Sequence, residues 1–234
     1  MTSTEVPDFD RLSDDYERLL SDPWRERFAS EHSFFIRQKC RVLLDELSRK
    51  LGPGRHLRVL DAGCGHGTAF QFLSPPHRII GSDVSVPMLR VAASKGPVVA
   101  QEAMALPFAD GAFDAVFAFC VYHHIAPEDR AAHLRELVRV VRPGGVVAVF
   151  EHNPFNPVTR TVFKRAPIDR GCEMIRPSAL RRLCAEAGLT DVSVGYLLFM
   201  PEPVAAVIGV VEDVLRWLPL GGQYFVSATV PGPA

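Results

Sequence analysis

The segment Val59-Leu60-Asp61-Ala62-Gly63-Cys64-Gly65-His66-Gly67 places three glycines at alternate positions directly after a short apolar run. Glycine lets the backbone turn sharply and lets a ligand approach without a Cβ in the way. Open α/β sheets bind ligands at the carboxyl ends of their strands, so this segment predicts a ligand-binding loop. The alternative is a tight strand-to-helix turn that binds nothing. The spacing is not the GxGxxG of nicotinamide-binding loops, because Thr68 stands where the third glycine would fall.

Apolar residues change their spacing along the chain. They recur at helical spacing up to residue 51, with Asp22 as a helix cap and Pro23 in the first turn, and Gly52-Pro53-Gly54 ends this pattern. Beyond it, short apolar runs alternate with helix-like stretches, which is typical of parallel strands joined by crossover helices. The expected strands are residues 57–62, 78–82, 97–100, 113–119, 146–151, 190–199 and 223–229. The expected helices are residues 24–51, 127–141, 178–187 and 204–218, with one more from Thr68 onward.

The 234 residues are expected to form one domain, because nothing in them looks like a flexible linker. We divide it into a helical preface (1–55), a ligand-binding core (56–152) and two lid-like insertions (153–176 and 200–221). Residues 203–220 are apolar, but they include charged side chains and are fewer than the ~20 residues that cross a bilayer. Core packing, a pocket cover or a dimer face is therefore expected there instead of a membrane span.

The composition disfavours several classes of partner. Lys and Arg number 26 against 27 Asp and Glu, a formal net charge of -1, so no overall field attracts nucleic acid or an anionic membrane. The five cysteines are scattered and show no CxxC pair or other metal-ligand spacing, so we expect free thiols and no metal. The N-terminus lacks the apolar stretch of a secretory signal, which predicts a cytoplasmic protein.

Two acidic residues follow the second and third predicted strands. The carboxylate of Asp83 can accept both hydroxyl protons of a ribose, although the same residue can serve only as a helix cap. Glu102 precedes a turn over residues 105–114, where an acid and backbone amides can hydrogen-bond an adenine edge. These positions favour a ligand that contains adenosine.

Four ordered segments carry a family resemblance: VLDAGCGHG (59–67), GSDVS (81–85), ALPFADGAFDAVFAFCVYHHI (105–125) and LRELVRVVRPGGVVAVFE (134–151). Over about residues 59–151 the chain resembles the class I S-adenosylmethionine-dependent methyltransferases of the small-molecule, type 11-like kind. The resemblance implies a Rossmann-like α/β fold with a seven-stranded, mainly parallel sheet, an antiparallel last strand and helices on both faces. It also implies S-adenosylmethionine as cofactor and S-adenosylhomocysteine as product.

The same resemblance implies a set of cofactor-binding residues, carried over by position. They are Asp61, Gly63, Cys64 and Gly65 around the methionine part, Asp83 at the ribose with Val84 beside it, Glu102 and Ala103 beside adenine, Cys120 near the sulfonium, and Tyr16 in a preface that often folds over the cofactor in related enzymes. Glu102 departs from the family pattern, in which this acid is more often aspartate.

Methyl transfer from a sulfonium is an in-line displacement, so such an enzyme mainly positions donor and acceptor and, for a hydroxyl, helps to remove a proton. The candidate catalytic residues are His123, after the fourth strand, and Glu151 and His152, after the fifth, because strand ends on this edge face the pocket. Each histidine can instead have only a packing or loop-anchoring role.

The connection 153–176 is longer than the fold needs and carries five cations against two acids. We expect it to help select the acceptor, whose phosphate or carboxylate such cations could meet.

The sequence thus predicts methyl transfer to a small-molecule acceptor, such as a natural-product or sugar-type intermediate, at oxygen, nitrogen or carbon. The alternative function is cofactor binding without methyl transfer, in a sensor, a scaffold or an enzyme that uses the sulfonium as a fixed cation. The glycine spacing disfavours a nicotinamide dehydrogenase, and the lack of a basic stripe disfavours a nucleic-acid methyltransferase. A homodimer is an open option.

Overall fold

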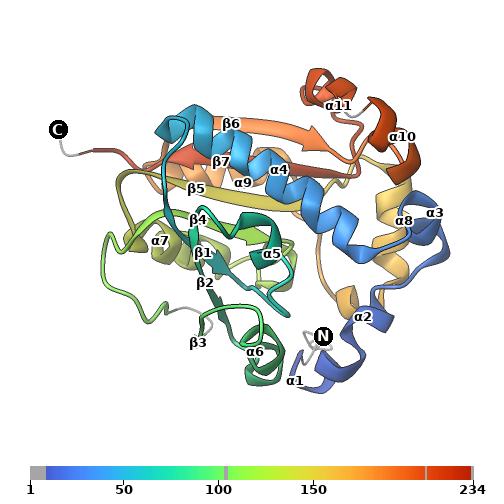
Figure 1. Ribbon diagram of the computed structural model, residues 1–234, viewed down its shortest axis with the longest axis horizontal. Coiled ribbons are helices and arrows are strands. Elements are labelled where there is room, and N and C mark those ends of the chain that lie inside the picture. The colour runs from blue at the N-terminus through green and yellow to red at the C-terminus, as the bar shows by residue number, and fades with distance from the viewer. Residues whose placement is uncertain (1–8, 103–104, 209, 233–234) are drawn as a thin grey trace.

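In the computed structural model, which describes residues 9–102, 105–208 and 210–232, seven strands form one sheet in the order β3-β2-β1-β4-β5-β7-β6 (Figure 1). They are β1 (Arg58–Ala62), β2 (Arg78–Asp83), β3 (Val98–Ala100), β4 (Phe113–Phe119), β5 (Val141–His152), β6 (Thr190–Leu197) and β7 (Gln223–Thr229). Strands β1 to β5 pair in parallel, and β7 runs antiparallel between β5 and β6. The predicted Rossmann-like sheet with an antiparallel last strand is confirmed.

Strand β1 lies at the point where the strand order reverses. It pairs with β2 on one side and with β4 on the other. In open α/β sheets a crevice is expected at such a point, at the carboxyl ends of the strands. This edge of the sheet is where a ligand site is expected.

Helices and 3-10 turns connect and cover the strands (Figure 1). They are α1 (Phe9–Leu12), η1 (Ser13–Asp15), α2 (Tyr16–Leu19), α3 (Pro23–Phe28), α4 (His32–Leu51), α5 (Phe70–Leu73), α6 (Val86–Ala92), η2 (Tyr122–His124), α7 (Arg130–Val140), α8 (Pro157–Arg165), η3 (Pro167–Asp169), α9 (Pro177–Glu186), α10 (Glu202–Ile208) and α11 (Val210–Leu215).

Both faces of the sheet are covered, because side chains alternate along each strand. In β4, Ala115 and Phe117 belong to a core cluster shared with α4 and α5. Val116 and Ala118, on the other face, belong to a cluster shared with α7 and α9. The expectation of helices on both faces is therefore confirmed.

The predicted helix over residues 24–51 was wrong in one respect, since it is two helices. Asp22 caps α3 by accepting the Trp24 N–H (2.8 Å), as expected. Ala29 then adopts an extended backbone (φ -150°, ψ 142°) and is buried. The next amide, Ser30 N–H, donates to the Glu202 carboxylate (3.1 Å), so a distant segment replaces the helical hydrogen bond.

The predicted helix over residues 127–141 is also shorter than expected. Residues 126–129 form a turn closed by the Asp129 N–H and the Ala126 carbonyl (2.9 Å), and α7 begins only at Arg130. Strand β5 begins at Val141, so residues 142–145 lie inside it and the strand is longer than the expected 146–151. There the register between β4 and β5 shifts, which accommodates the glycines within the strand.

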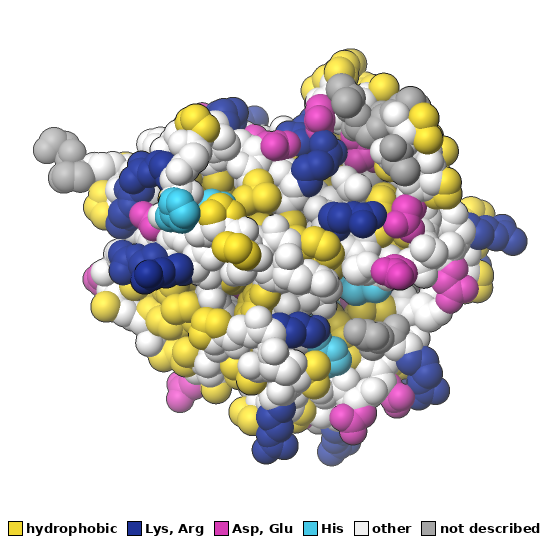
Figure 2. Space-filling model, in the orientation of Figure 1, with side chains coloured by type: hydrophobic (Ala, Val, Ile, Leu, Met, Phe, Trp, Pro, Cys, Tyr) yellow, Lys and Arg dark blue, Asp and Glu magenta, His cyan; other side chains and the backbone are white. Residues whose placement is uncertain are grey.

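The two insertions contain short helices, α8 and η3 in the first and α10 and α11 in the second. In the described part of the chain no helix is long and apolar enough to span a membrane. The five cysteines are free thiols, as expected. Figure 2 shows cationic and anionic side chains interspersed on the face in view, in keeping with the near-zero net charge.

Asp114 joins three central strands, and its removal is expected to destabilise the protein. Its carboxylate accepts the Arg58 N–H (2.8 Å) and the Arg142 guanidinium (2.7 Å). Burial opposes ionisation, but Arg142 and the Arg58 amide lower the pKa of Asp114 overall. A lowered pKa gives stability that is present above the unfolded pKa and is lost as the pH falls through the folded one.

We expect Asp114→Asn to lower the free energy of unfolding by about 1–2 kcal/mol at pH 7, and by less near pH 3, in urea titrations. Asp110→Asn is the matched control, because Asp110 is an exposed partner of Arg139 and its loss should cost less than about 1 kcal/mol. Equal effects of the two substitutions would contradict this role of Asp114.

Candidate functional site

The glycine loop after β1 is fixed against the ends of β2 and β4. The Gly63 and Cys64 N–H groups both donate to the Ser82 carbonyl (2.8 and 3.0 Å). Gly63 has φ 79°, and a Cβ there would lie 2.6 Å from Val121 Cγ2. A larger residue at position 63 would have to push away the segment after β4, so the loop requires glycine both for its conformation and for this close contact.

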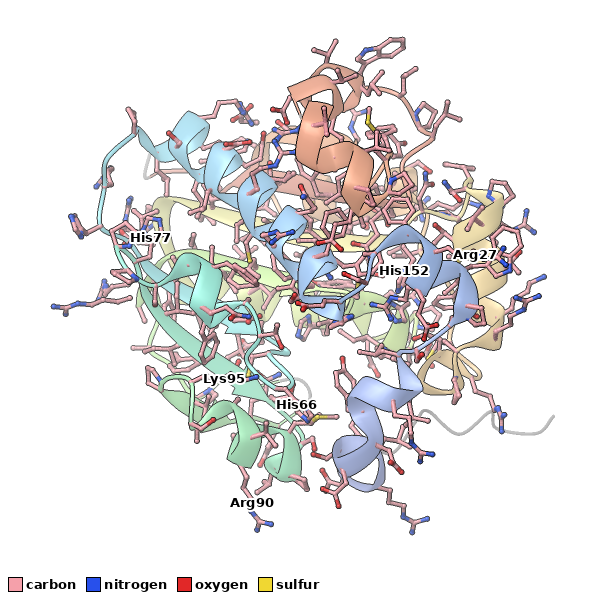
Figure 3. All side chains as sticks on the ribbon, turned by 45° about the vertical axis from the view of Figure 1, so that its right-hand side comes forward. Arg27, His66, His77, Arg90, Lys95 and His152 are labelled. Atoms are coloured by element: carbon pink, nitrogen blue, oxygen red, sulfur yellow. The ribbon has the colours of Figure 1, made fainter. Side chains whose placement is uncertain are left out.

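A small cavity of about 60 Å³ opens beside this loop. Its lining includes five of the residues predicted to bind the cofactor: Tyr16, Asp61, Gly63, Cys64 and Gly65. Burial, together with the nearby Asp83 charge, raises the pKa of Asp61 to about 8, although Lys39 opposes the shift. The loop also contributes His66, whose ring lies 5.0 Å from that of Tyr16 and which Figure 3 places beside the N-terminal helices.

Asp83 holds the glycine loop itself. Its two carboxylate oxygens accept the Ser85 N–H (2.9 Å) and the Gly65 N–H (2.8 Å). Burial raises its pKa, while these amides oppose the shift. Asp83 lines neither this cavity nor the larger one described next, so its ribose contact stays a prediction.

Val84 and Glu102, the other described residues predicted to contact adenosine, line neither cavity. Val84 is exposed after β2, and Glu102 is exposed after β3, where it forms an isolated bridge with Ala105. Ala103 lies outside the described residues. The roles of Val84, Glu102 and Ala103 therefore also stay predictions.

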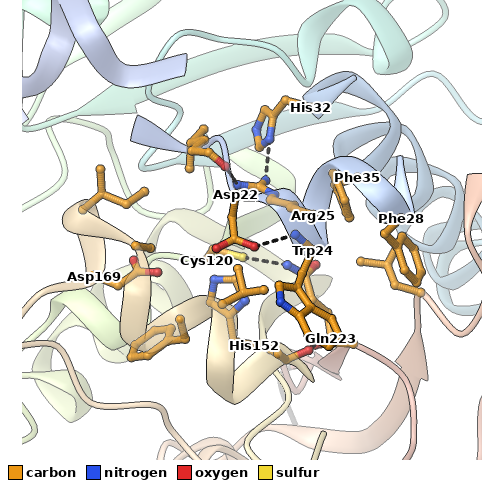
Figure 4. A pocket seen from close by; sticks show the side chains of 18 of the residues that line it. Asp22, Trp24, Arg25, Phe28, His32, Phe35, Cys120, His152, Asp169 and Gln223 are labelled. Carbon is orange, nitrogen blue, oxygen red and sulfur yellow. Dashed lines mark hydrogen bonds between the residues drawn. The ribbon is translucent and has the colours of Figure 1, made fainter. Parts of the chain in front are cut away.

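A larger cavity of about 340 Å³ lies between α2–α4, the ends of β4 and β5, the start of β7, and the first insertion (Figure 4). Aromatic side chains, among them Phe28, Phe35 and Phe163, form part of its wall. Tyr16, His32, Ile36 and Phe119 line both cavities, so the two adjoin.

The predicted catalytic residues lie at this larger cavity, but not in equivalent positions. His123 and His152 line it, whereas Glu151 lies behind them and is almost completely buried. His123 is held between two carboxylates, with Nδ1 2.7 Å from Glu151 and Nε2 3.2 Å from Asp169. Burial disfavours a charged ring, but these carboxylates outweigh it and raise the pKa of His123 to about 10.

Cys120, predicted near the sulfonium, lies in the wall of the larger cavity. It has a left-handed backbone (φ 58°), and its Sγ lies 3.5 Å from Lys39 Nζ and 3.4 Å from Gln223 Nε2. Burial raises its pKa, but Lys39 and His152 outweigh burial and lower it to about 7. Gln223 Oε1 is buried and has no hydrogen-bond partner within the described residues.

Sequence reasoning missed three of these residues: Lys39, Asp169 and Gln223. Lys39 could have been noticed, because it is a charged residue that lies on the buried face of an amphipathic helix. No motif or strand end near Asp169 in the connection 153–176 indicated that it would reach the cavity. Gln223 is the first residue of β7, and only the antiparallel direction of that strand brings it to the edge where the parallel strands end.

Most of the cations of the first insertion lie outside the larger cavity, where we expected them to meet the acceptor. Of the five, only Arg165 lines the larger cavity, and the others are exposed. The cavity instead takes cations from the preface, namely Lys39 and Arg25, and burial lowers the pKa of Arg25.

Comparison with known proteins agrees with this geometry. Residues 60–149 match the family model described as "Methyltransferase domain". A tRNA (carboxymethyluridine(34)-5-O)-methyltransferase from Arabidopsis thaliana is 40% identical over 93 residues, which are 39% of this chain and 23% of that protein. A demethylmenaquinone methyltransferase from Thermobifida fusca is 37% identical over 166 residues, which are 65% of this chain and 63% of that protein. The chain thus spans less than two thirds of either relative.

A solved structure shows the same fold over nearly the whole chain. It is a S-adenosylmethionine-dependent methyltransferase from Thermotoga maritima, with a TM-score of 0.66 at 18% sequence identity, and the match covers 95% of this chain and 97% of that one. The family match, the strand order and the glycine loop together show that this chain carries a domain of the class I S-adenosylmethionine-dependent methyltransferases, type 11, with S-adenosylmethionine as its cofactor.

Proposed function

We propose that the protein transfers the methyl group of S-adenosylmethionine to a small-molecule acceptor of the natural-product or sugar type, as a step of small-molecule biosynthesis. The observation that supports this most is the pair of adjoining cavities. The small one lies at the glycine loop, and the larger one lies beyond Tyr16 and Phe119. A cofactor in the first can present its methyl group to an acceptor in the second, which satisfies the in-line requirement.

On the cofactor side, the residues around the small cavity hold the methionine part: Tyr16, Asp61, Gly63, Cys64 and Gly65. In the proposal, Asp83 and Val84 face the ribose, and Glu102 and Ala103 face adenine. Cys120, at the end of β4, faces the sulfonium from the acceptor side.

A small acceptor is favoured by the size and shape of the larger cavity. Its volume of about 340 Å³ falls in the range of small-molecule sites. The net charge of -1 offers no general attraction for a nucleic-acid backbone. The two relatives act on a tRNA and on demethylmenaquinone by name, so the acceptor has to be proposed from this chain's own cavity.

Polar groups in the cavity suggest the chemistry of that acceptor. The buried oxygen of Gln223 has no donor among the described residues, which suits a hydroxyl or N–H on the acceptor. Lys39, Arg25 and Arg165 suit a carboxylate or phosphate on the same molecule. His152 and His123, with Glu151 behind them, are proposed to make the acceptor atom nucleophilic. Homodimer formation and a cytoplasmic location stay predictions of the sequence.

Asp83→Asn tests the cofactor side. The substitution keeps the side chain's shape but removes the charge that orients Gly65 and would accept the ribose hydroxyls. We expect the Kd for S-adenosylmethionine and for S-adenosylhomocysteine to rise at least about tenfold in calorimetric titration. Glu186→Gln, on the exposed surface of α9, is the matched control with the same change in charge. Unchanged affinity in Asp83→Asn would remove the ribose role.

His152→Gln tests the acceptor side. With methyl-labelled S-adenosylmethionine and a panel of phenols, hydroxy acids and sugar phosphates, we expect label transfer that falls about a hundredfold in this variant, while the cofactor Kd stays within a factor of two. Transfer to tRNA but to none of the small molecules would contradict the proposed acceptor class. Cofactor binding without formation of S-adenosylhomocysteine in any arm would favour the non-methylating alternative.

A further inference from the structure

Three side chains that are distant in the sequence meet at the larger cavity. His123 comes from η2 after β4, His152 ends β5, and Asp169 ends η3 in the first insertion. One ligand atom from each lies within 4.8 Å of the others. Figure 4 shows His152 and Asp169 beside the cavity, and all three residues line it.

The hydrogen bonds around His123 restrict which ring nitrogen carries a proton. Glu151 accepts the Tyr122 N–H (2.7 Å) through one oxygen and contacts His123 Nδ1 (2.7 Å) through the other. Nδ1 is therefore the donor, and in a neutral ring Nε2 carries a lone pair. That nitrogen lies 3.2 Å from the Asp169 carboxylate, so in a neutral ring two acceptor atoms would point at one another. Something positive has to lie between them, either a second proton or a metal ion.

The surroundings favour a metal ion over a shared proton. A proton bridges two atoms, whereas His152 supplies a third ligand atom at the same place. A carboxylate on the far nitrogen of a ligating histidine, as Glu151 is to His123, is the usual arrangement behind metal-bound imidazoles. The side chains of Glu151 and Asp169 are 1% and 6% exposed, and two buried carboxylates attract a cation strongly.

We propose that His123 Nε2, His152 and Asp169 bind one divalent transition-metal ion, of which Zn²⁺ is the representative. Two imidazoles and one carboxylate suit such ions and leave coordination positions open toward the cavity. Binding brings ligand atoms that lie up to 4.8 Å apart to within about 3.4 Å of one another, as tetrahedral coordination at about 2.1 Å requires. Rotation of side chains lining a cavity can supply this movement.

The inference deepens the proposed function and rests on it. An acceptor hydroxyl that binds the ion through its oxygen loses its proton to water more readily. The oxygen then forms a bond to the methyl carbon, the carbon–sulfur bond breaks with its electron pair moving to sulfur, and S-adenosylhomocysteine leaves as a neutral thioether. The overall balance is one hydroxyl and one sulfonium giving one methyl ether, one thioether and one proton.

The test begins with chelator-treated, dialysed protein titrated with Zn²⁺ by calorimetry and with Co²⁺ by visible absorption. We expect one ion per chain with a Kd of about 10 µM or tighter, and Co²⁺ absorption typical of nitrogen and oxygen ligands in a four- or five-coordinate site. Asp169→Asn and His152→Gln should each weaken Zn²⁺ binding at least about tenfold. His152 is the safer variant for folding, since it is less buried than Asp169.

The matched controls are His56→Gln and Glu173→Gln, which remove one exposed histidine and one exposed carboxylate outside the site. Wild-type protein that binds no Zn²⁺ tighter than about 100 µM would overturn the metal site, as would site variants that bind like the controls. The failure of the two proposals is distinguishable. Metal-free protein that binds S-adenosylmethionine and forms S-adenosylhomocysteine leaves methyl transfer standing, whereas one bound Zn²⁺ without any turnover leaves only the metal site.

Discussion

The contact between Gly63 and Val121 is the constraint on which the site depends. It joins the loop after β1 to the segment after β4, at the point where the strand order reverses. The Ser82 carbonyl and the Asp83 carboxylate fix the other side of the same loop, at the end of β2. Three strand ends are thus held at one place by backbone atoms, the Asp83 carboxylate and the absence of a Cβ on Gly63. A cofactor site built in this way needs few particular side chains.

A second constraint connects the core to the first insertion. Glu151 belongs to β5 and Asp169 to η3, and His123 lies between them. Leaving one of these charges buried without its partners would be costly, so the cluster holds η3 against the ends of β4 and β5. The insertion therefore closes one wall of the larger cavity through this ionic contact, and Phe163 and Ile168 pack there as well.

The larger cavity is built mainly by parts of the chain outside the family match. Residues 60–149 contribute only the end of β4 and the segment after it, whereas α2–α4, the last residue of β5, α8, η3 and the start of β7 supply most of the wall. In the proposed function, the family domain holds the methyl donor and these segments select the acceptor.

The sequence by itself determined the sheet, the glycine loop and the identity of the cofactor. Periodicity located the seven strands, and the alternate glycines located the site, because these signals arise from neighbouring residues. The sequence prediction failed where a distant residue decides the local structure. The Ser30 N–H donates to Glu202, and the helix expected over residues 24–51 is interrupted there.

The lining of the larger cavity was decided only by the tertiary structure. His123 and His152 were found from their positions after strands, but the partner that joins them, Asp169, arrives from an insertion. Lys39 and Gln223 reach Cys120 from α4 and from an antiparallel strand. The spacing of these residues along the sequence does not predict their contacts, because the packing of helices on the sheet and the direction of β7 bring them together.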